Sequence, residues 1–233
     1  MVEYYIDPED LVVDFLRTNL TDPRARAEAT ESKTITATAG QTEFAVTPTT
    51  GTAYCITAVT KDGTSLRKWK DYFWDGQNSK IYLAVAATVG QSIVITFKYG
   101  TSNWIYADRP DDNLSRTGYP RIEVFSPSGN GIQLGNYEAP VEGSPILQID
   151  IWTKDGQVFT IGSSKYANNY LGRYIGNRIT RAFEKEIDDL YPALYNYNPV
   201  SLPRAGPYEE ESQIYHTILE INLRGIKLGR IEY

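Results

Sequence analysis

The segment Ile146–Gly156, ILQIDIWTKDG, carries the strand pattern that decides the fold of this chain. Leu147, Ile149 and Ile151 fall on one side of an extended backbone, because successive side chains of a strand point to opposite faces. The residues between them, Asp150 included, fall on the other side. This alternation predicts an antiparallel sheet that is covered on one face only.

Other segments of the chain are expected to add strands to the same sheet. YPRIEVF at 119–125 places Ile122 and Val124 on one face, and GIQLGNYEAP at 131–140 fits a further short strand. Residues 214–226 alternate in the same way before the chain passes into a short final strand. A Tyr-, Asn- and Pro-rich loop is predicted at residues 193–212, before this last segment, and we interpret it as a functional arm or contact surface.

Two helices are predicted to cover the apolar face of the sheet. The longer one begins at Ser163 or Ser164 as N-cap and ends before Pro192. Its apolar stripe consists of Leu171, Ile175, Ile179, Phe183, Ile187 and Leu190. The shorter helix begins after Asp7, with Pro8 at the first helical position. Because its own apolar face is small, it belongs with the C-terminal part of the chain.

Residues 33–100 have a different texture, rich in Thr, Val, Ile and Tyr with alternation of period two and regularly spaced glycines. This pattern is typical of an all-β sandwich of short strands. The stretch carries 7 Lys/Arg against 4 Asp/Glu, whereas the rest of the chain has 16 against 25. We therefore expect an α+β domain formed by residues 1–32 and 101–233, in which an antiparallel sheet is packed by a short N-terminal helix and one long helix, with an inserted β-sandwich domain at 33–100.

The six predicted strands of the insert include SLRKW at 65–69, while the polar stretch 24–33 is interpreted as a connector. The string TKDG occurs at 60–63 and again at 153–156. Its flanking residues differ between the two copies, so it is predicted to be the same turn used twice. Asp62-Gly63 should close a hairpin in the insert, and Asp155-Gly156 should end a strand of the other domain.

Composition narrows the classes of function. The 233-residue chain has a net charge of −6, which argues against a protein that grips nucleic-acid phosphates. No apolar run is long enough for a membrane span and the N-terminus lacks a signal-peptide pattern, so the chain reads as soluble and unsecreted. Cys55 is the single cysteine and is expected to be buried in a strand. The 18 tyrosines favour amphipathic aromatic contact surfaces.

Catalytic and metal-binding patterns are weak. His216 is the single histidine and is interpreted as a structural or interface residue. The pairs Asp111/Asp112 and Asp188/Asp189 are read as solvated loop and helix-end residues. GNGIQLG at 129–135 is read as a hairpin turn, since it does not open a capped helix. The chain is therefore not expected to be an enzyme, and no catalytic residue, metal or cofactor is assigned.

The α+β part resembles the tail terminator, or tail completion, proteins of long-tailed bacteriophages and related archaeal viruses. The segments that carry the resemblance are PEDLVVDFLRTNL, YPRIEVF, ILQIDIWTKDG, YLGRYIGNRITRAFE and IYHTILEINLRGI. The insert is similar to the β-sandwich modules of viral tail and decoration proteins.

This resemblance implies a virion protein of the tail or neck region, assembled in the host cytoplasm. It implies a homo-oligomer, a hexameric ring, that ends the tail tube and contacts the tube protein and the head connector or neck proteins. DNA would pass through the lumen without specific binding, and no membrane is involved. A ring needs a heterologous subunit interface. Tyr195, Tyr197 and Tyr208 are its candidate residues.

Two other classes of function remain as alternatives. The insert could bind glycans if Trp69, Tyr72 and Trp74 exposed their rings to sugars. Otherwise Tyr72 and Trp74 pack inside the sandwich, while Lys68 and Lys70 face water. The chain could also be another neck or tail protein. A carboxylate-based glycan hydrolase would require a cleft between paired carboxylates about 5 to 9.5 Å apart, and nothing in the sequence points to one.

Overall fold

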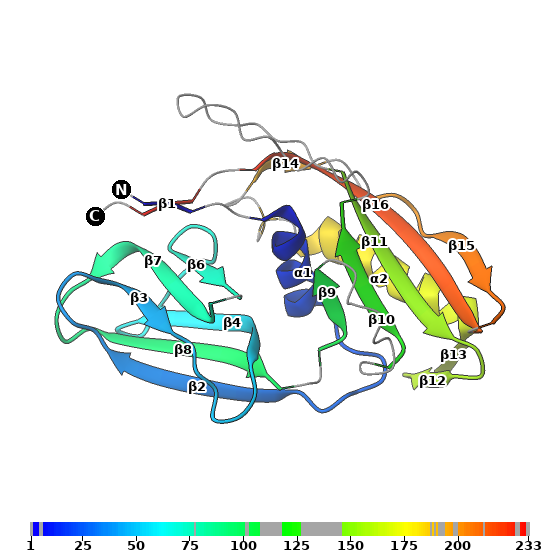
Figure 1. Ribbon diagram of the computed structural model, residues 1–233, viewed down its shortest axis with the longest axis horizontal. Helices are drawn as coiled ribbons and strands as arrows, with labels where there is room; N and C mark the ends of the chain where they lie inside the picture. Colours follow the sequence, from blue (N-terminus) through cyan, green and yellow to red (C-terminus); the bar gives the residue numbers. More distant parts are fainter. Residues whose placement is uncertain are drawn as a thin grey trace. The chain divides into compact units, whose positions relative to one another are not determined.

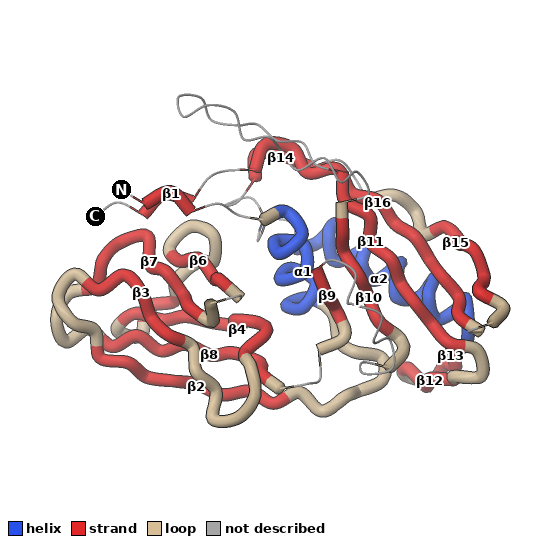
Figure 2. Tube along the Cα trace, in the orientation of Figure 1, coloured by secondary structure: helices blue, strands red, loops and turns tan. Residues whose placement is uncertain are grey.

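A computed structural model describes residues 2–4, 7–76, 78–100, 103–107, 118–126, 146–186, 188, 190, 194–197, 200–211, 213–226 and 229–231 (Figure 1). The described chain is mixed α+β, with mostly antiparallel sheets and two helices (Figure 2). It divides into two compact units. Unit 1 comprises Met1–Ile6, Ala27–Asn103 and Lys227–Tyr233, and unit 2 comprises Asp7–Arg26 and Trp104–Ile226.

Unit 2 is built on one sheet whose central strands are antiparallel. Its strands are β9 (Ile105–Ala107), β10 (Arg121–Phe125), β11 (Ile146–Lys154), β14 (Leu194–Tyr197), β15 (Arg204–Glu209) and β16 (Ile214–Ile226). Strand β11 lies between β10 and β16, β9 is parallel to β10, and both β14 and β15 pair with β16. The predicted strands at 119–125, 146–156 and 214–226 are confirmed. The stretch 193–212 contains two strands and is not a simple loop.

The two helices of unit 2 contact each other and the apolar face of this sheet. Helix α1 (Pro8–Asn19) begins as predicted, with the Asp7 carboxylate accepting from the backbone N–H of Glu9 at 2.8 Å. Helix α2 (Asn168–Glu186) buries Leu171, Ile175, Ile179 and Phe183, four members of the predicted stripe. The ring centroids of Phe15 in α1 and Phe183 in α2 lie 4.6 Å apart. The short helix therefore belongs with the C-terminal part, as expected.

The predicted start of α2 is wrong, because a hairpin lies where the helix was expected to begin. Ser163 lies in the turn, and Ser164 in the second strand, of a hairpin formed by β12 (Val158–Ile161) and β13 (Ser164–Ala167). Gly162 has φ +63° there, a conformation that favours glycine and suits a tight turn. The two serines before the apolar helical stripe therefore belong to a hairpin and not to an N-cap. The second TKDG string precedes this hairpin.

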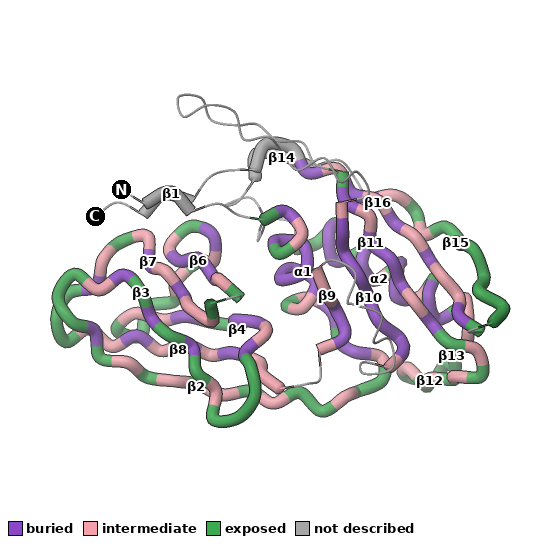
Figure 3. Tube along the Cα trace, in the orientation of Figure 1, coloured by how far each residue is buried: buried purple, intermediate pink, exposed green. Residues whose placement is uncertain are grey.

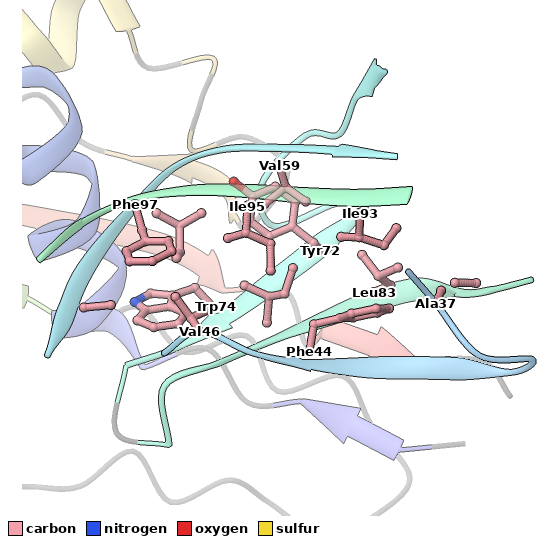
Figure 4. Packing of buried hydrophobic residues seen from close by; sticks show 14 residues of the cluster. Ala37, Phe44, Val46, Val59, Tyr72, Trp74, Leu83, Ile93, Ile95 and Phe97 are labelled. Carbon is pink, nitrogen blue, oxygen red and sulfur yellow. The ribbon is translucent and has the colours of Figure 1, made fainter. Parts of the chain in front are cut away.

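Unit 1 contains two larger sheets and one short strand pair. The strands are β2 (Ala29–Thr36), β8 (Ser92–Tyr99), β4 (Ala53–Lys61) and β5 (Thr64–Ser65) in one sheet, β3 (Gln41–Ala45), β7 (Lys80–Ala87) and β6 (Tyr72–Asp75) in the other, and the pair β1 (Val2–Tyr4) and β17 (Gly229–Ile231). Both larger sheets contribute to one apolar cluster, whose aromatic members are Phe44, Tyr72, Trp74 and Phe97 (Figure 4). Cys55 is buried, as expected.

Several strand limits in unit 1 differ from expectation. Strand β2 begins at Ala29, inside the expected connector, because a polar edge strand lacks the apolar alternation that marks a strand. The strand expected at 65–69 is absent from the described chain beyond Ser65, and Trp69 has φ +62°. Asp62 and Gly63 close the β4–β5 hairpin as predicted, both with positive φ. The expected domain limits of 33 and 100 stay a prediction. The compact segment that contains them runs over Ala27–Asn103.

Candidate functional site

The face of the unit 2 sheet that points away from the helices carries buried charged residues. Arg121 and Glu123 lie on β10 and Asp150 on β11, and they are only 3%, 2% and 1% exposed. In Figure 3, β10 is buried along its whole length. The sequence predicted a sheet covered on one face only. The other face is buried at these three residues, whereas Gln148 and Trp152 on the same face are half-buried. A charge is buried at this level only where partners compensate its lost hydration.

These residues, together with Trp152 and His216, form what we call the polar cluster. Arg121 and Glu123 are its first pair. Nη2 of Arg121 lies 2.9 Å from Oε1 of Glu123. Oε2 of the same carboxylate accepts a hydrogen bond of 2.9 Å from the indole Nε1 of Trp152 on β11. The Arg121 guanidinium also lies over two aromatic rings, 5.5 Å from the Tyr119 centroid and 5.9 Å from the Trp152 centroid. Glu123 therefore pairs with a cation on its own strand and ties β10 to β11 through the hydrogen bond from Trp152.

His216 and Asp150 form the second pair. The His216 ring stacks on Trp152 with centroids 4.0 Å apart and planes 5° apart, and its Nε2 lies 2.9 Å from Oδ1 of Asp150. Gln148 donates a 2.8 Å hydrogen bond to the same carboxylate oxygen. On the other side of the ring, a Cβ at Gly206 would lie 2.7 Å from Nδ1 of His216. Only glycine lets β15 pass this closely over the imidazole.

This cluster orients a histidine between an aromatic ring and a carboxylate, an arrangement that holds one ring orientation firmly. The structural or interface role expected of His216 stays a prediction. No group of three or more His, Cys, Asp or Glu side chains suited to a metal ion occurs among the described residues. Asp188 is exposed, whereas Asp189, the Asp111/Asp112 pair and residues 129–140 lie outside the described part of the chain.

Sequence reasoning missed the cluster because a strand with one polar face usually exposes that face. One signal was present: Trp152 shares its face with Gln148 and Asp150. A large aromatic side chain on a supposedly solvated face indicates that something covers it.

The aromatic residues proposed for glycan binding are buried. Trp69, Tyr72 and Trp74 are 6%, 3% and 8% exposed, and Tyr72 and Trp74 belong to the apolar cluster of unit 1. Lys68 does not simply face water, since its Nζ donates to the carbonyl of Ile56 at 2.8 Å. Stacking on a sugar requires an exposed ring, so these three residues do not supply such a surface.

The three candidate interface tyrosines lie on the strands beside β16. Tyr195 and Tyr197 belong to β14, whose side chains are outside the described set. Tyr208, near the end of β15, is 42% exposed, and its ring centroid lies 4.6 Å from that of Tyr215. Tyr208 is thus a solvent-facing aromatic residue at the edge of the sheet.

No described helix has the length and apolar character needed to cross a membrane. Comparisons of the chain with protein-family models, with curated proteins and with solved structures give no match.

Proposed function

We propose that this chain is a virion structural protein that forms a ring, ends a tail tube and joins the tail to the head connector. The observation that carries the proposal is the order and pairing of elements in unit 2. The five segments on which the resemblance to tail terminators rests correspond to α1, β10, β11, α2 and β16. The three strands among them are neighbours in one antiparallel sheet, and both helices contact its apolar face. The protein acts by assembly and has no catalytic role.

Exposed apolar side chains in unit 2 support assembly as the mode of action. Leu202 is 80% exposed, Tyr170 68% and Val158 57%. Single exposed apolar residues are ordinary on protein surfaces, but tyrosines together with large aliphatic residues are the side chains that subunit interfaces enclose. A ring requires two different contact patches on each subunit, and unit 2 has such residues on its β12–β13 hairpin, on α2 and around β15.

Unit 1 fits this function as a β-sandwich module inserted into the assembly domain. In support, the segment Ala27–Asn103 lies between α1 and β9 in the sequence, and its two larger sheets share one apolar cluster. The module would contribute surface to the virion without taking part in the sheet of unit 2.

Polymerising tail tubes test the function directly. Purified tube protein would be assembled with and without the full chain, and tube lengths and ends would be measured by electron microscopy. We expect shorter tubes with added density at one end. The variant Leu202→Asp/Tyr208→Asp should cap fewer tubes, and the surface variant Arg67→Glu/Lys70→Glu in unit 1 should cap as well as the unmodified chain. Tubes of unchanged length that carry no bound protein would contradict the proposal.

A further inference from the structure

The outer surface of α2 is a basic stripe that the fold itself does not use. Tyr170, Arg173, Asn177 and Arg181 recur every three or four residues and are all exposed. Tyr174 lies beside them, and its ring packs at a tilt of 38° against Tyr166 of β13, with centroids 4.4 Å apart. The opposite side of the helix faces the sheet. Arg178 is half-buried next to the exposed residues. We call Tyr170, Arg173, Arg178 and Arg181 the arginine stripe.

This stripe concentrates positive charge in an acidic chain. Residues 156–183 contain four Lys/Arg and no Asp/Glu, although the whole chain has a net charge of −6. A carboxylate three or four residues away stabilises an exposed helical arginine. The positions that flank Arg173 at this spacing hold Asn169, Tyr170, Gly176 and Asn177. Within the described part of the chain, none of the three arginines forms an ion pair.

A patch of opposite charge lies elsewhere on the same unit. Glu209, Glu210 and Glu211 are consecutive and exposed where β15 turns into β16. Tyr208 precedes them, so this patch also combines a tyrosine with charge. The backbone N–H of Asp155 donates to the carbonyl of Gln213 at 2.8 Å, which fixes the connection at the end of β11. We call residues 208–211 the acidic turn.

The two patches belong to different parts of unit 2. In Figure 1, α2 crosses one face of the sheet formed by β11 and β16, whereas the β15–β16 connection lies at the end of that sheet. Each copy of the chain therefore carries both the arginine stripe and a patch of opposite charge. The two patches form no ion pair with each other inside one copy. This is the requirement of a heterologous contact, in which one patch of each copy meets a different patch of the next.

We propose that the arginine stripe of one copy docks on the acidic turn of a second copy. Arginine suits this contact because its planar guanidinium can bind a carboxylate through two hydrogen bonds. Tyr170 and Tyr208 supply the apolar contact area that charges alone lack. Tyrosine and arginine are both enriched in interfaces. The proposal rests on the proposed function and names the interface between neighbouring subunits of the ring.

Paired charge reversals test this contact. Arg173→Glu/Arg181→Glu reverses the stripe, and Glu210→Lys/Glu211→Lys reverses the turn, in all cases at exposed positions. Self-association of each full-length variant would be measured by mass photometry over a range of protein and salt concentrations. We expect each variant alone to associate at least about tenfold more weakly at low salt, since complementary charges steer and hold such contacts. An equimolar mixture of the two should associate again, because their reversed patches match. Arg67→Glu/Lys70→Glu is the charge-matched control and should behave as the unmodified chain.

The outcomes separate this inference from the proposed function. If the unmodified chain and both variants assemble equally well, the ring stands and the contact is wrong. If both variants fail but their mixture does not recover, the two patches do not meet each other. If the stripe variant assembles normally and loses only salt-sensitive binding to a DNA duplex, the stripe serves a nucleic acid and the inference is overturned. Circular dichroism of each variant confirms that it is folded.

Discussion

The core of unit 1 is an apolar cluster enclosed by two sheets, whereas the sheet of unit 2 buries apolar side chains on one face and charged ones on the other. In unit 1, Phe97, Ile95 and Ile93 of β8 all point into the cluster and are fully buried. In unit 2, the neighbouring positions Ile149 and Asp150 of β11 are equally buried on opposite faces. Both sheets follow the same strand alternation, but they protect chemically different groups.

This difference has an energetic consequence. An apolar core loses stability in proportion to the volume removed, because the surroundings only partly close the cavity. A buried ion pair behaves differently: removing one partner strands the other charge, while removing both can cost little. The two units should therefore answer single and double substitutions in different ways.

Phe97→Ala should give the largest effect. Phe97 is fully buried in the unit 1 cluster, so its truncation should lower the free energy of unfolding of that unit by about 4 kcal/mol. Hydrogen exchange followed by mass spectrometry can measure each unit separately, with β7 reporting on unit 1 and β11 on unit 2. Exchange in β11 should be unchanged. Phe97→Leu is the control and should cost clearly less. Equal acceleration of both strands would show that the units do not unfold independently.

Arg121→Met should be the next largest. It removes the Arg121 cation from the buried Glu123 carboxylate and should cost about 3 kcal/mol, measured by denaturant unfolding and by exchange in β10 and β11. The double variant Arg121→Met/Glu123→Gln should be more stable than Arg121→Met alone, since the amide oxygen can still accept from Trp152. A double variant less stable than the single one would mean that the pair is not coupled as described.

Gly172→Ala should change the stability less, and whether it raises or lowers the melting temperature is informative. Alanine favours a helix over glycine by about 1 kcal/mol. However, a Cβ at Gly172 would press on the side chain of Thr217 in β16, and crowding a packed interface typically costs about 1 to 3 kcal/mol. We expect a net loss of thermal stability, with Thr217→Ala added to the same chain restoring part of it, because it removes the Oγ1 that the new Cβ would meet. A melting temperature above that of the unmodified chain would show that α2 and β16 are not packed this closely.

Tyr119→Phe should have the smallest effect, visible only in alkali. Burial raises the pKa of Tyr119 above its ordinary 10.0. The unfolded chain then releases this proton at a lower pH than the folded one, so stability is full below about pH 10 and falls as the pH rises towards the raised pKa. Urea unfolding from pH 8 to 11 should show a shallower alkaline loss for Tyr119→Phe. The exposed Tyr170→Phe is the control, and identical slopes for both variants would contradict the assignment.

The sequence predicts those parts of the fold that depend on neighbouring residues and misses those that depend on distant ones. The start of α1 and the strand centred on Ile149 depend on local chemistry, a cap and an alternation, and both are confirmed. The β12–β13 hairpin was missed because Ser163 and Ser164 satisfy the composition of a turn and of an N-cap alike. The parallel pairing of the three-residue β9 with β10 depends on a partner far along the chain and leaves no local pattern.

The polar cluster was less predictable than the strands that carry it. Alternation places Asp150 and Trp152 on one face but does not say whether that face meets water. The burial of Trp69, Tyr72 and Trp74 was likewise open, since an aromatic group on a short strand suits both a core and a ligand surface. Of the three interface tyrosines, only Tyr208 has a described side chain, and its role stays a prediction.

The mass of the full chain in solution tests the central claim most directly. Mass photometry, from nanomolar to micromolar protein and with or without tail tubes, would count the species present. The proposed function predicts a population at six times the 26.2 kDa of one chain, which grows with concentration or on addition of tubes. A single species at 26.2 kDa under every condition, with no protein on the tubes, would contradict it.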